Sequence, residues 1–437
     1  MHFFLQMAVV LATYRLLWPL FRRLGQVQVV AIMVAGFVLG PSLLGAIAPD
    51  VQEWIFPAKA SVAGTQVVHP NLAALYVTGQ LGLVLYMFIV GMGFNVGIFA
   101  DHLRHAAVTS FAGIAAPMIL GGAVGYLMWT NGLFPDKMAN WQAALFVAAA
   151  VAITAFPMLA WIVYDSGLLH TRLGTMALAC AAADDAAAWI LLAAVVASTA
   201  GSPAVALLAL FGGLAYLLVM VTAGRALLRR VGEWAAPRIA ADGTIPPAAL
   251  LIVMLVLLAG AWVTDRVGIY AVFGAFIAGT VMPRGALTEA LRDRLEPLTA
   301  YVLLPAFFVY SGLNTRLTLL FDPTVLAMLA LVLVVSFVGK GVSVGLAARI
   351  QGMSWREAGS LGSLMNARGL MELILLNIGL NAGVVSPEIY TVLAVMAIVT
   401  TFAATPMYRW IASGHTFDAH GVRAPVAKSP EPVASPA

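Results

Sequence analysis

Long apolar stretches separated by short polar segments dominate the chain. A helix that crosses a bilayer needs roughly 20 apolar residues, and thirteen stretches approach this length. They cover residues 3–20, 28–48, 71–96, 106–130, 141–164, 172–199, 203–224, 246–263, 267–283, 297–316, 325–348, 358–381 and 388–412. The stretches are continuously apolar, so they predict membrane helices and exclude a transmembrane barrel, whose strands alternate. The predicted fold class is an all-α polytopic membrane protein with about thirteen transmembrane helices.

Composition narrows the class further. Of the 437 residues, 62% are hydrophobic and 10% are charged, whereas a soluble domain carries about 25% charged residues. A water-soluble enzyme and a disordered chain are therefore excluded. The only cysteine, Cys180, rules out a disulfide within the chain. The first twenty residues lack a basic start and a cleavage signal, which predicts a first membrane helix and not a removable leader.

The positions of the basic residues predict the orientation. With the amino terminus outside, sixteen of the 23 lysines and arginines fall in cytoplasmic segments, four in external ones and three within spans. Cytoplasmic loops of membrane proteins carry such an excess of positive charge. We therefore expect the carboxyl terminus in the cytoplasm and the protein in a cell membrane, such as a bacterial inner membrane. The net charge of +4 reflects this asymmetry and predicts no nucleic-acid partner.

Two pairs of segments echo each other along the chain. Residues 29–41 resemble 270–283, and residues 85–92 resemble 306–313. In the predicted topology the two members of each pair cross the membrane in opposite directions. This pattern is typical of inverted repeats, in which two interrupted helices meet at a mid-membrane site. The alternative is that small and aromatic residues recur by chance in an apolar protein.

Two interruptions lie in the corresponding spans of the two halves. One is the segment 153–157, which contains Pro157, and the other is the segment 366–369, which contains Gly369. Proline removes a backbone donor and clashes with the preceding turn, so backbone groups are freed there. Freed groups at membrane depth are tolerated only against protein or a water-filled cavity. The sequence thus predicts two broken, crossing helices, with a plain kink and a loosely packed glycine as the alternative.

Few ionisable residues lie deep within the predicted spans. Asp184 and Asp185 are adjacent and flanked by alanines, and each charge costs roughly 2.5–3.5 kcal/mol at a helix centre. The pair therefore needs partners or protons, although one aspartate could merely bond a neighbouring helix. Lys340, between two glycines, is the natural counter-ion, unless it lies nearer the end of its span than the pattern indicates.

The oxygen-rich residues of these spans suit a hard monovalent cation. A carboxylate is a hard oxygen ligand, and Thr154 with carbonyls near Phe156 could add further oxygens. A buried carboxylate that holds either a proton or a metal ion exchanges one for the other. Arg368 and Glu372 are four residues apart on one helix face, so we predict a structural ion pair at the end of the broken helix.

Motifs of soluble chemistry are absent from the sequence. It contains no dinucleotide fingerprint and no phosphate-binding loop, and its seven histidines form no spaced metal cluster. We therefore expect a protein that is not an enzyme, needs no cofactor and does not use ATP.

Seven segments together carry a resemblance to a known family. They are AGFVLGPSLLG at 35–45, GLVLYMFIVGM at 82–92, ITAFPMLA at 153–160, ADDAAAWILLA at 183–193, FFVYSGLNT at 307–315, GKGVSVG at 339–345 and MNARGLMELILLNIGL at 365–380. In this order they resemble the cation:proton antiporter-2 family, which consists of monovalent cation/H+ antiporters with the Na+/H+ exchanger fold. The resemblance extends to about residue 412. The sequence departs from the common family pattern at Met33, Gly93, Asn95 and Trp161.

The resemblance implies a homodimer in which different helices form a static panel, a moving transport core and a linker. The implied regions are panel helices at 1–96 and 246–320, core transport helices at 97–199 and 321–412, a linker with a cytoplasmic loop at 200–245, and a disordered tail at 413–437.

The resemblance also implies roles for individual residues. Asp185 is the carboxylate for cation and proton, Asp184 pairs with Lys340, and Thr154 lies at the crossing of the broken helices, with a metal-binding role. In the family, two acids with a lysine accompany electrogenic exchange. We therefore expect an elevator-type antiporter of Na+ or K+ against H+. A cation channel, a membrane sensor and an organic-anion transporter on a related fold are the alternatives.

Overall fold

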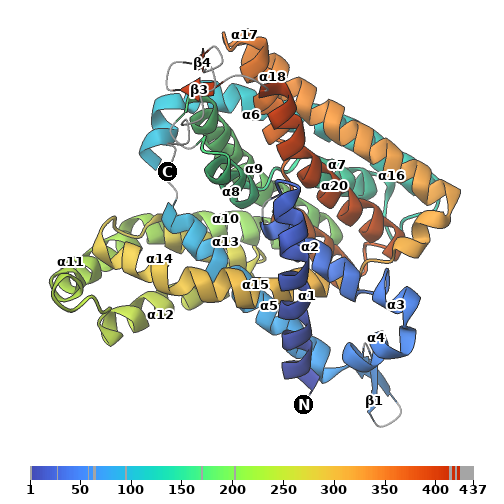
Figure 1. Cartoon of the computed structure of the whole chain (residues 1–437), viewed down its shortest axis with the longest axis horizontal. Coiled ribbons are helices and arrows are strands. Elements are labelled where there is room, and N and C mark those ends of the chain that lie inside the picture. The colour runs from blue at the N-terminus through green and yellow to red at the C-terminus, as the bar shows by residue number, and fades with distance from the viewer. Residues whose placement is uncertain are drawn as a thin grey trace, which may run out of the picture.

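The fold is built almost entirely of helices, as Figure 1 shows for a computed structural model of the chain. The structure describes residues 2–26, 28–57, 59–62, 65–93, 96–168, 171–200, 203–412, 416–418 and 421–423. The predicted all-α polytopic class is confirmed, with two short antiparallel hairpins as the only strands in the described part of the chain.

The described elements follow one another in a simple order. The helices are α1 (His2–Arg23), α2 (Gln28–Leu39), α3 (Leu44–Ile47), α4 (Pro49–Ile55), α5 (Pro70–Gly93), α6 (Val96–Thr130), α7 (Asn140–Ala152), α8 (Phe156–Asp165), α9 (Arg172–Ala200), α10 (Pro203–Val219), α11 (Arg225–Asp242), α12 (Pro247–Arg266), α13 (Ala271–Thr280), α14 (Ala286–Leu298), α15 (Leu304–Leu313), α16 (Pro323–Ser336), α17 (Ser343–Ile350), α18 (Trp355–Leu364), α19 (Leu370–Asn381) and α20 (Pro387–Ala412). The strands are β1 (Lys59–Val62), β2 (Thr65–Val68), β3 (Thr416–Asp418) and β4 (Gly421–Arg423). A 3₁₀ turn covers Leu317–Phe321, and π-helical turns cover Met220–Gly224, Thr299–Leu303 and Phe337–Val342.

The helices correspond to the predicted spans. Within the described residues, nine helical segments are long and apolar enough to cross a membrane, and shorter apolar helices accompany them. The predicted spans 141–164 and 358–381 are each formed by two short helices, α7 with α8 and α18 with α19. Two strands, β3 and β4, lie within the segment 413–437 that was expected to be disordered. The other residues of that segment lie outside the described part.

Local sequence explains where several helices begin and end. The Asp322 side chain accepts hydrogen bonds from the first backbone amides of α16, and Pro323 occupies the first helical position. Ser354 and Glu357 form a reciprocal capping box at the start of α18. Gly243, with φ of 63°, ends α11 in the left-handed conformation that glycine adopts without strain.

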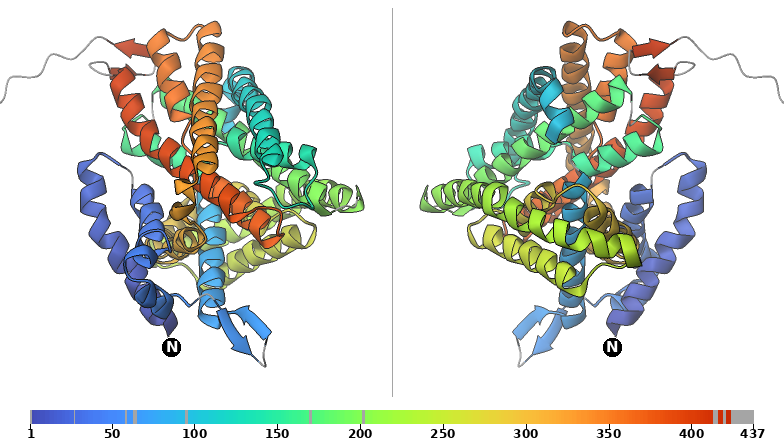
Figure 2. Two further views of the ribbon diagram at one scale, coloured as in Figure 1. Left: turned by 90° about the vertical axis from the view of Figure 1, so that its right-hand side faces the viewer. Right: turned by 90° about the vertical axis from the view of Figure 1, so that its left-hand side faces the viewer.

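The helices pack in two groups (Figure 1). The first group contains α1, α2, α5 and α12–α15, and the second contains α6–α9 and α16–α20. Helix α10 contacts α9 of the second group and α12 of the first, so it joins the two. Figure 2 shows the amino-terminal end of α1 and the β1–β2 hairpin at one end of the molecule and the β3–β4 hairpin at the opposite end.

Close glycine contacts in the first group follow the sequence repeat. Helix α2 packs on α15, where a Cβ built on Gly312 would lie 2.7 Å from the Cα of Gly36. Helix α5 packs on α13, where a Cβ built on Gly279 would lie 2.9 Å from the Cα of Gly91. In the repeat, Gly36 corresponds to Gly279 and Gly91 to Gly312. The α2–α15 contact therefore has its counterpart in the α13–α5 contact, as expected of a two-fold relation between the repeats.

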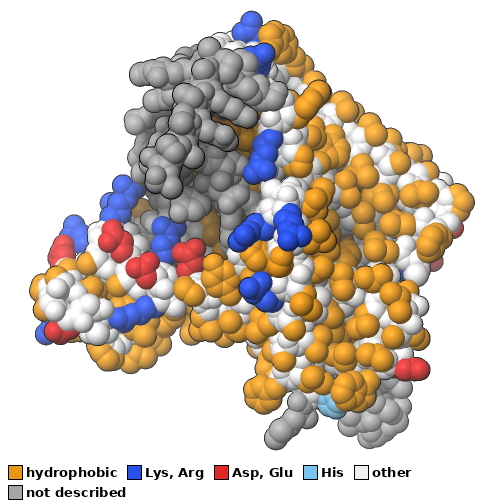
Figure 3. Space-filling model, in the orientation of Figure 1, with side chains coloured by type: hydrophobic (Ala, Val, Ile, Leu, Met, Phe, Trp, Pro, Cys, Tyr) orange, Lys and Arg blue, Asp and Glu red, His pale blue; other side chains and the backbone are white. Residues whose placement is uncertain are grey.

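Polarity is distributed in the manner of a membrane protein. Hydrophobic side chains cover much of the face in Figure 3, whereas charged side chains gather over α11 and α14. Large apolar side chains such as Leu16, Ile119 and Phe321 are exposed. In contrast, a set of ionisable side chains is buried inside the second group, namely Asp184, Asp185, Lys340, Arg368 and Glu372. Because buried charge is costly at membrane depth, this cluster is the candidate functional site.

Candidate functional site

Two interrupted helices cross in the second group. Helix α7 ends at Ala152 and α8 begins at Phe156, while residues 365–369 separate α18 from α19. The Ala155 amide donates to the Ala367 carbonyl at 3.1 Å. The Thr154 hydroxyl donates to the Met365 carbonyl at 3.0 Å. The two unwound segments are therefore hydrogen-bonded to each other, which satisfies part of the backbone that the breaks expose.

Gly369 permits the second break. Its φ of 145° is unfavourable for any residue with a Cβ. A Cβ built there would also lie 3.1 Å from the Met158 side chain of α8. The chain can thus turn sharply into α19 while α8 passes close by.

Arg368 caps the first half of the broken span. Its Nη1 donates to the Ala150 carbonyl at 2.7 Å, and its Nη2 donates to the Val151 carbonyl. The last carbonyls of a helix have no partner within that helix and carry partial negative charge. The guanidinium therefore neutralises the carboxyl end of α7. The Thr401 hydroxyl of α20 holds the Arg368 backbone. It accepts a hydrogen bond from the Arg368 amide and donates one to the Arg368 carbonyl, each at 2.9 Å.

The ion pair expected between Arg368 and Glu372 is not formed. The guanidinium points to the α7 carbonyls, which are reachable only because the two broken helices cross. Glu372 is buried, and neither of its carboxylate oxygens has a hydrogen-bond partner among the described residues. The four-residue spacing assumed one continuous helix, but Arg368 lies in the break before α19 and only Glu372 lies on that helix.

Asp184 and Lys340 are in direct contact. The Lys340 Nζ lies 2.7 Å from Asp184 Oδ2, and both side chains are fully buried. The ammonium also donates to the Ala152 carbonyl at the end of α7. The Ser110 hydroxyl of α6 donates to the other oxygen of Asp184. Both oxygens of Asp184 therefore have donors, as a buried carboxylate requires.

Lys340 is presented by a π-helical turn with a glycine on each side. A Cβ on Gly339 would lie 3.4 Å from Pro117 of α6, and one on Gly341 would lie 3.1 Å from the Asn366 amide. Both neighbours can approach closely because these positions lack side chains. Single π-helical turns inside helices are frequent at functional sites.

Asp185 differs from its neighbour in having a free oxygen. Its Oδ1 accepts a hydrogen bond from the Phe156 amide at 3.3 Å, at the amino end of α8. Its Oδ2 is buried and has no hydrogen-bond partner in the described part of the structure. Adjacent helical positions point about 100° apart, which explains why the two aspartates meet different partners. Asp185 is thus the carboxylate with capacity to bind another species.

A cation at this position would find oxygen ligands only. The Asp185 carboxylate and the Thr154 hydroxyl, which lies at the same break, are the candidates. The Thr154 oxygen keeps acceptor capacity while its proton is donated to Met365. Within the described residues there is no cluster of three His, Cys, Asp or Glu side chains that could hold a metal ion. The donor set suits a weakly held alkali cation better than a transition metal.

Sequence reasoning missed several residues that complete the site. Ser110 bonds Asp184, and Thr401 holds the Arg368 backbone. Single hydroxyl residues are common in membrane helices, so neither stands out in the sequence.

A second missed set joins the two groups of helices. The Asn377 amide of α19 donates to the Ser311 hydroxyl of α15 at 2.9 Å. The Tyr390 hydroxyl of α20 donates to the Ser311 carbonyl at 3.1 Å. All three side chains are buried.

A family model described as "Sodium/hydrogen exchanger, transmembrane" matches residues 8–414. The chain belongs to this family. The sequence is 37% identical to the Na(+)/H(+) antiporter NhaS4 of Synechocystis over 405 residues, which cover 91% of this chain and 94% of that protein. It is 31% identical to the K(+)/H(+) antiporter 1 of Saccharomyces cerevisiae over 416 residues, covering 93% of this chain and 46% of that protein. This chain thus spans about half the length of that yeast relative.

Solved structures show the same exchanger fold. The sodium proton antiporter MjNhaP1 of Methanocaldococcus jannaschii superposes with a TM-score of 0.62 and 15% identity, covering 93% of this chain and 94% of that one. Such a low identity supports the fold alone. Together with the family match, it confirms the resemblance to cation:proton antiporters that the sequence motifs indicated.

Proposed function

We propose that this protein exchanges a monovalent cation, Na+ or K+, for protons across a cell membrane. The observation that carries the proposal is Asp185, a buried carboxylate with one unpartnered oxygen, beside the crossing of two broken helices. A carboxylate in such surroundings is stable only when a proton or a cation neutralises it. The two species compete for the same oxygens, so binding of one releases the other.

The neighbouring ion pair supports electrogenic exchange. Asp184 and Lys340 neutralise each other when no cation is bound, at a distance of 2.7 Å. When a cation binds beside Asp184 and Asp185, Lys340 releases its proton and Asp185 releases another. Two protons then move against one monovalent cation, so each cycle carries net charge. Thr154 contributes a further oxygen to the cation.

The two groups of helices suggest how the site reaches both sides of the membrane. We infer that the first group is the static panel and that the second, which holds every buried charge named above, moves as the transport core. Helix α10 joins the two and is the linker. This is an elevator-type mechanism, and a homodimer formed through the panel would hold it fixed in the bilayer. The amino terminus is assigned to the outside and the carboxyl terminus to the cytoplasm.

Proton release from liposomes tests the proposal. Purified protein is reconstituted with a pH-sensitive dye inside, and Na+, K+ or Li+ is added outside in separate runs. We expect cation-dependent proton movement for the intact chain and none for Asp185→Asn. The control Asp293→Asn makes the same chemical change at an exposed position on α14 and should behave as the intact chain does.

None of the alternative functions predicts cation-dependent proton movement in this assay. A channel dissipates the cation gradient without moving protons in return, and a sensor moves nothing. An organic-anion transporter shows no response to Na+, K+ or Li+. Full coupled exchange by Asp185→Asn would refute the role assigned to that carboxylate.

A further inference from the structure

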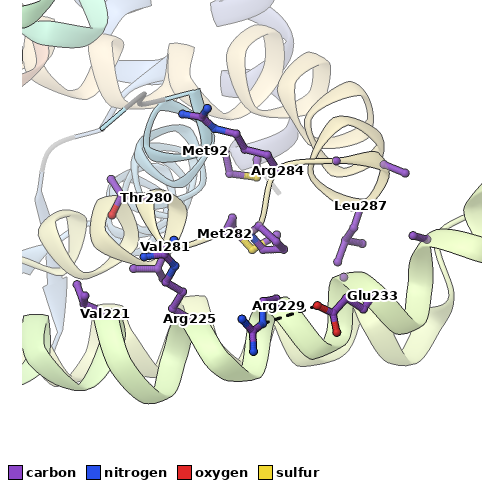
Figure 4. Close-up of a pocket in the computed structure, with 15 residues that line it drawn as sticks. Met92, Val221, Arg225, Arg229, Glu233, Thr280, Val281, Met282, Arg284 and Leu287 are labelled. Atoms are coloured by element: carbon purple, nitrogen blue, oxygen red, sulfur yellow. Dashed lines mark ion pairs between the residues drawn. The ribbon is translucent and has the colours of Figure 1, made fainter. Parts of the chain in front are cut away.

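A cavity of about 800 Å³ lies away from the helix crossing, between α11, the end of α5 and the connection from α13 to α14. Figure 4 shows α11 on one side, with Arg225 and Arg229, and the connection that carries Met282 and Arg284 on the other. Neither the cation site nor the buried charges border it. The volume lies within the roughly 300–1,000 Å³ typical of small-molecule sites.

The lining of this cavity is amphipathic. Met92, Val281, Met282 and Leu287 supply apolar surface. Three arginines supply positive charge, and among the described lining residues Glu233 is the only acid. Glu233 lies 3.7 Å from Arg229, and both side chains are largely exposed. The cavity therefore keeps a net positive charge next to an apolar wall.

The position along the chain places this cavity at a lipid–water boundary. Large apolar side chains of α10 are exposed, among them Phe211 and Leu218, as expected of a surface in contact with lipid. Val221, which lines the cavity, is also exposed. One turn later α11 begins with Arg225, and six of its 18 residues are charged. The cavity thus opens where acyl chains give way to headgroups.

We propose that this cavity binds an anionic phospholipid. The guanidiniums of Arg225 and Arg229 hold the phosphate, because arginine pairs with phosphate oxygens in a bidentate manner. The glycerol and the first methylene groups pack against Met92 and Met282. A free phosphate ion would leave most of the cavity and its apolar wall unused. The bound lipid fastens α11 to α5 and α14, and so braces the linker against the first group of helices.

Lipid titration of the purified full-length chain in detergent tests the site. The probes are phosphatidylglycerol, phosphatidylcholine with the same acyl chains, and glycerol 3-phosphate. Binding is measured by native mass spectrometry and by the shift in melting temperature. We expect stabilisation by phosphatidylglycerol alone. Because each basic residue near an anionic headgroup contributes about fivefold in affinity, the double variant Arg225→Gln/Arg229→Gln should bind roughly thirtyfold more weakly.

Two further variants separate a specific site from general charge attraction. Arg230→Gln/Arg238→Gln removes the same charge from exposed positions of the same helix that are not among the lining residues described. It should lose little affinity. Ala236→Phe adds a bulky side chain to the lining of the cavity and keeps every arginine, so it should weaken binding.

Four results would overturn the proposal. The first two are equal losses of lipid affinity in the two double variants and full lipid binding by Ala236→Phe. The third is binding of phosphatidylcholine as tight as that of phosphatidylglycerol. The fourth is equally tight binding of glycerol 3-phosphate, which would assign the cavity to a soluble anion. Lipid binding is measured without transport, so its outcome is independent of the antiport assay.

Discussion

Replacing Lys340 by methionine tests the energetic role of the buried pair. The substitution keeps an unbranched side chain of similar length but removes the ammonium, which lies 2.7 Å from Asp184 Oδ2. Asp184 would then be a buried carboxylate with the Ser110 hydroxyl as its remaining donor among the described residues. Removing one partner of a buried ion pair typically costs about 3–5 kcal/mol, because the remaining charge stays buried without compensation. We expect Lys340→Met to lower the free energy of unfolding by this amount.

The double variant Asp184→Asn/Lys340→Met provides the decisive comparison. Removing both charges of a buried pair is often close to neutral, so the double variant should regain most of the lost stability. The unfolding free energy is measured by titrating detergent-solubilised protein with a denaturing detergent and following tryptophan fluorescence. Lys137→Met is the control, because that lysine is exposed and, among the described residues, donates a single long hydrogen bond to the Ala382 carbonyl, at 3.3 Å.

The reasoning fails if the two charges prove energetically independent. In that case Lys340→Met and the double variant would be equally unstable, and the coupling free energy from the double-mutant cycle would be close to zero. A loss for Lys137→Met as large as that for Lys340→Met would also contradict it.

Three other substitutions test separate features. Glu372→Gln should leave the melting temperature within about 2 °C of the intact chain, because the Glu372 carboxylate oxygens accept no hydrogen bond among the described residues. A larger decrease in melting temperature would reveal a partner for the Glu372 charge. Arg368→Lys should abolish cation-dependent proton release, because an ammonium cannot reproduce the forked contact of the guanidinium with two α7 carbonyls. Retained transport by this variant would contradict the capping role of Arg368. Hydrogen bonds to its carboxylate, above all from the Val325 amide, lower the pKa of Asp322. Asp322→Ala should therefore reduce stability at neutral pH, and the difference from the intact chain should vanish as pH falls through the lowered pKa. A difference that persists at low pH would exclude the carboxylate as its cause.

Much of the fold could be predicted because the bilayer imposes simple constraints. Continuous apolar stretches located the spans, and Pro157 with Gly369 located the two breaks. The contact of Asp184 with Lys340 was also predictable, since so few buried charges were available to pair. The structure shows this contact directly at 2.7 Å.

Contacts between distant segments could not be predicted in the same way. Arg368 is 218 positions from its acceptor Ala150, and only the crossing of the broken helices brings them together. The four-residue spacing in the predicted span favoured Glu372 as the partner, and that prediction was wrong because Arg368 lies in the break before α19. Ser110 carries no signal in the sequence because serine is ordinary in membrane helices. Its role follows from the packing of α6 on α9.

The bonds from Ser311 to Asn377 and Tyr390 bear on how fast the protein can cycle. A core that slides past the panel, as proposed, must break both bonds on each passage and re-form them on return. Each is worth about 0.5–1.5 kcal/mol, so together they slow departure from this conformation by roughly five- to two-hundredfold. The same two contacts would lengthen the dwell time of the transporter with its site open to one side only.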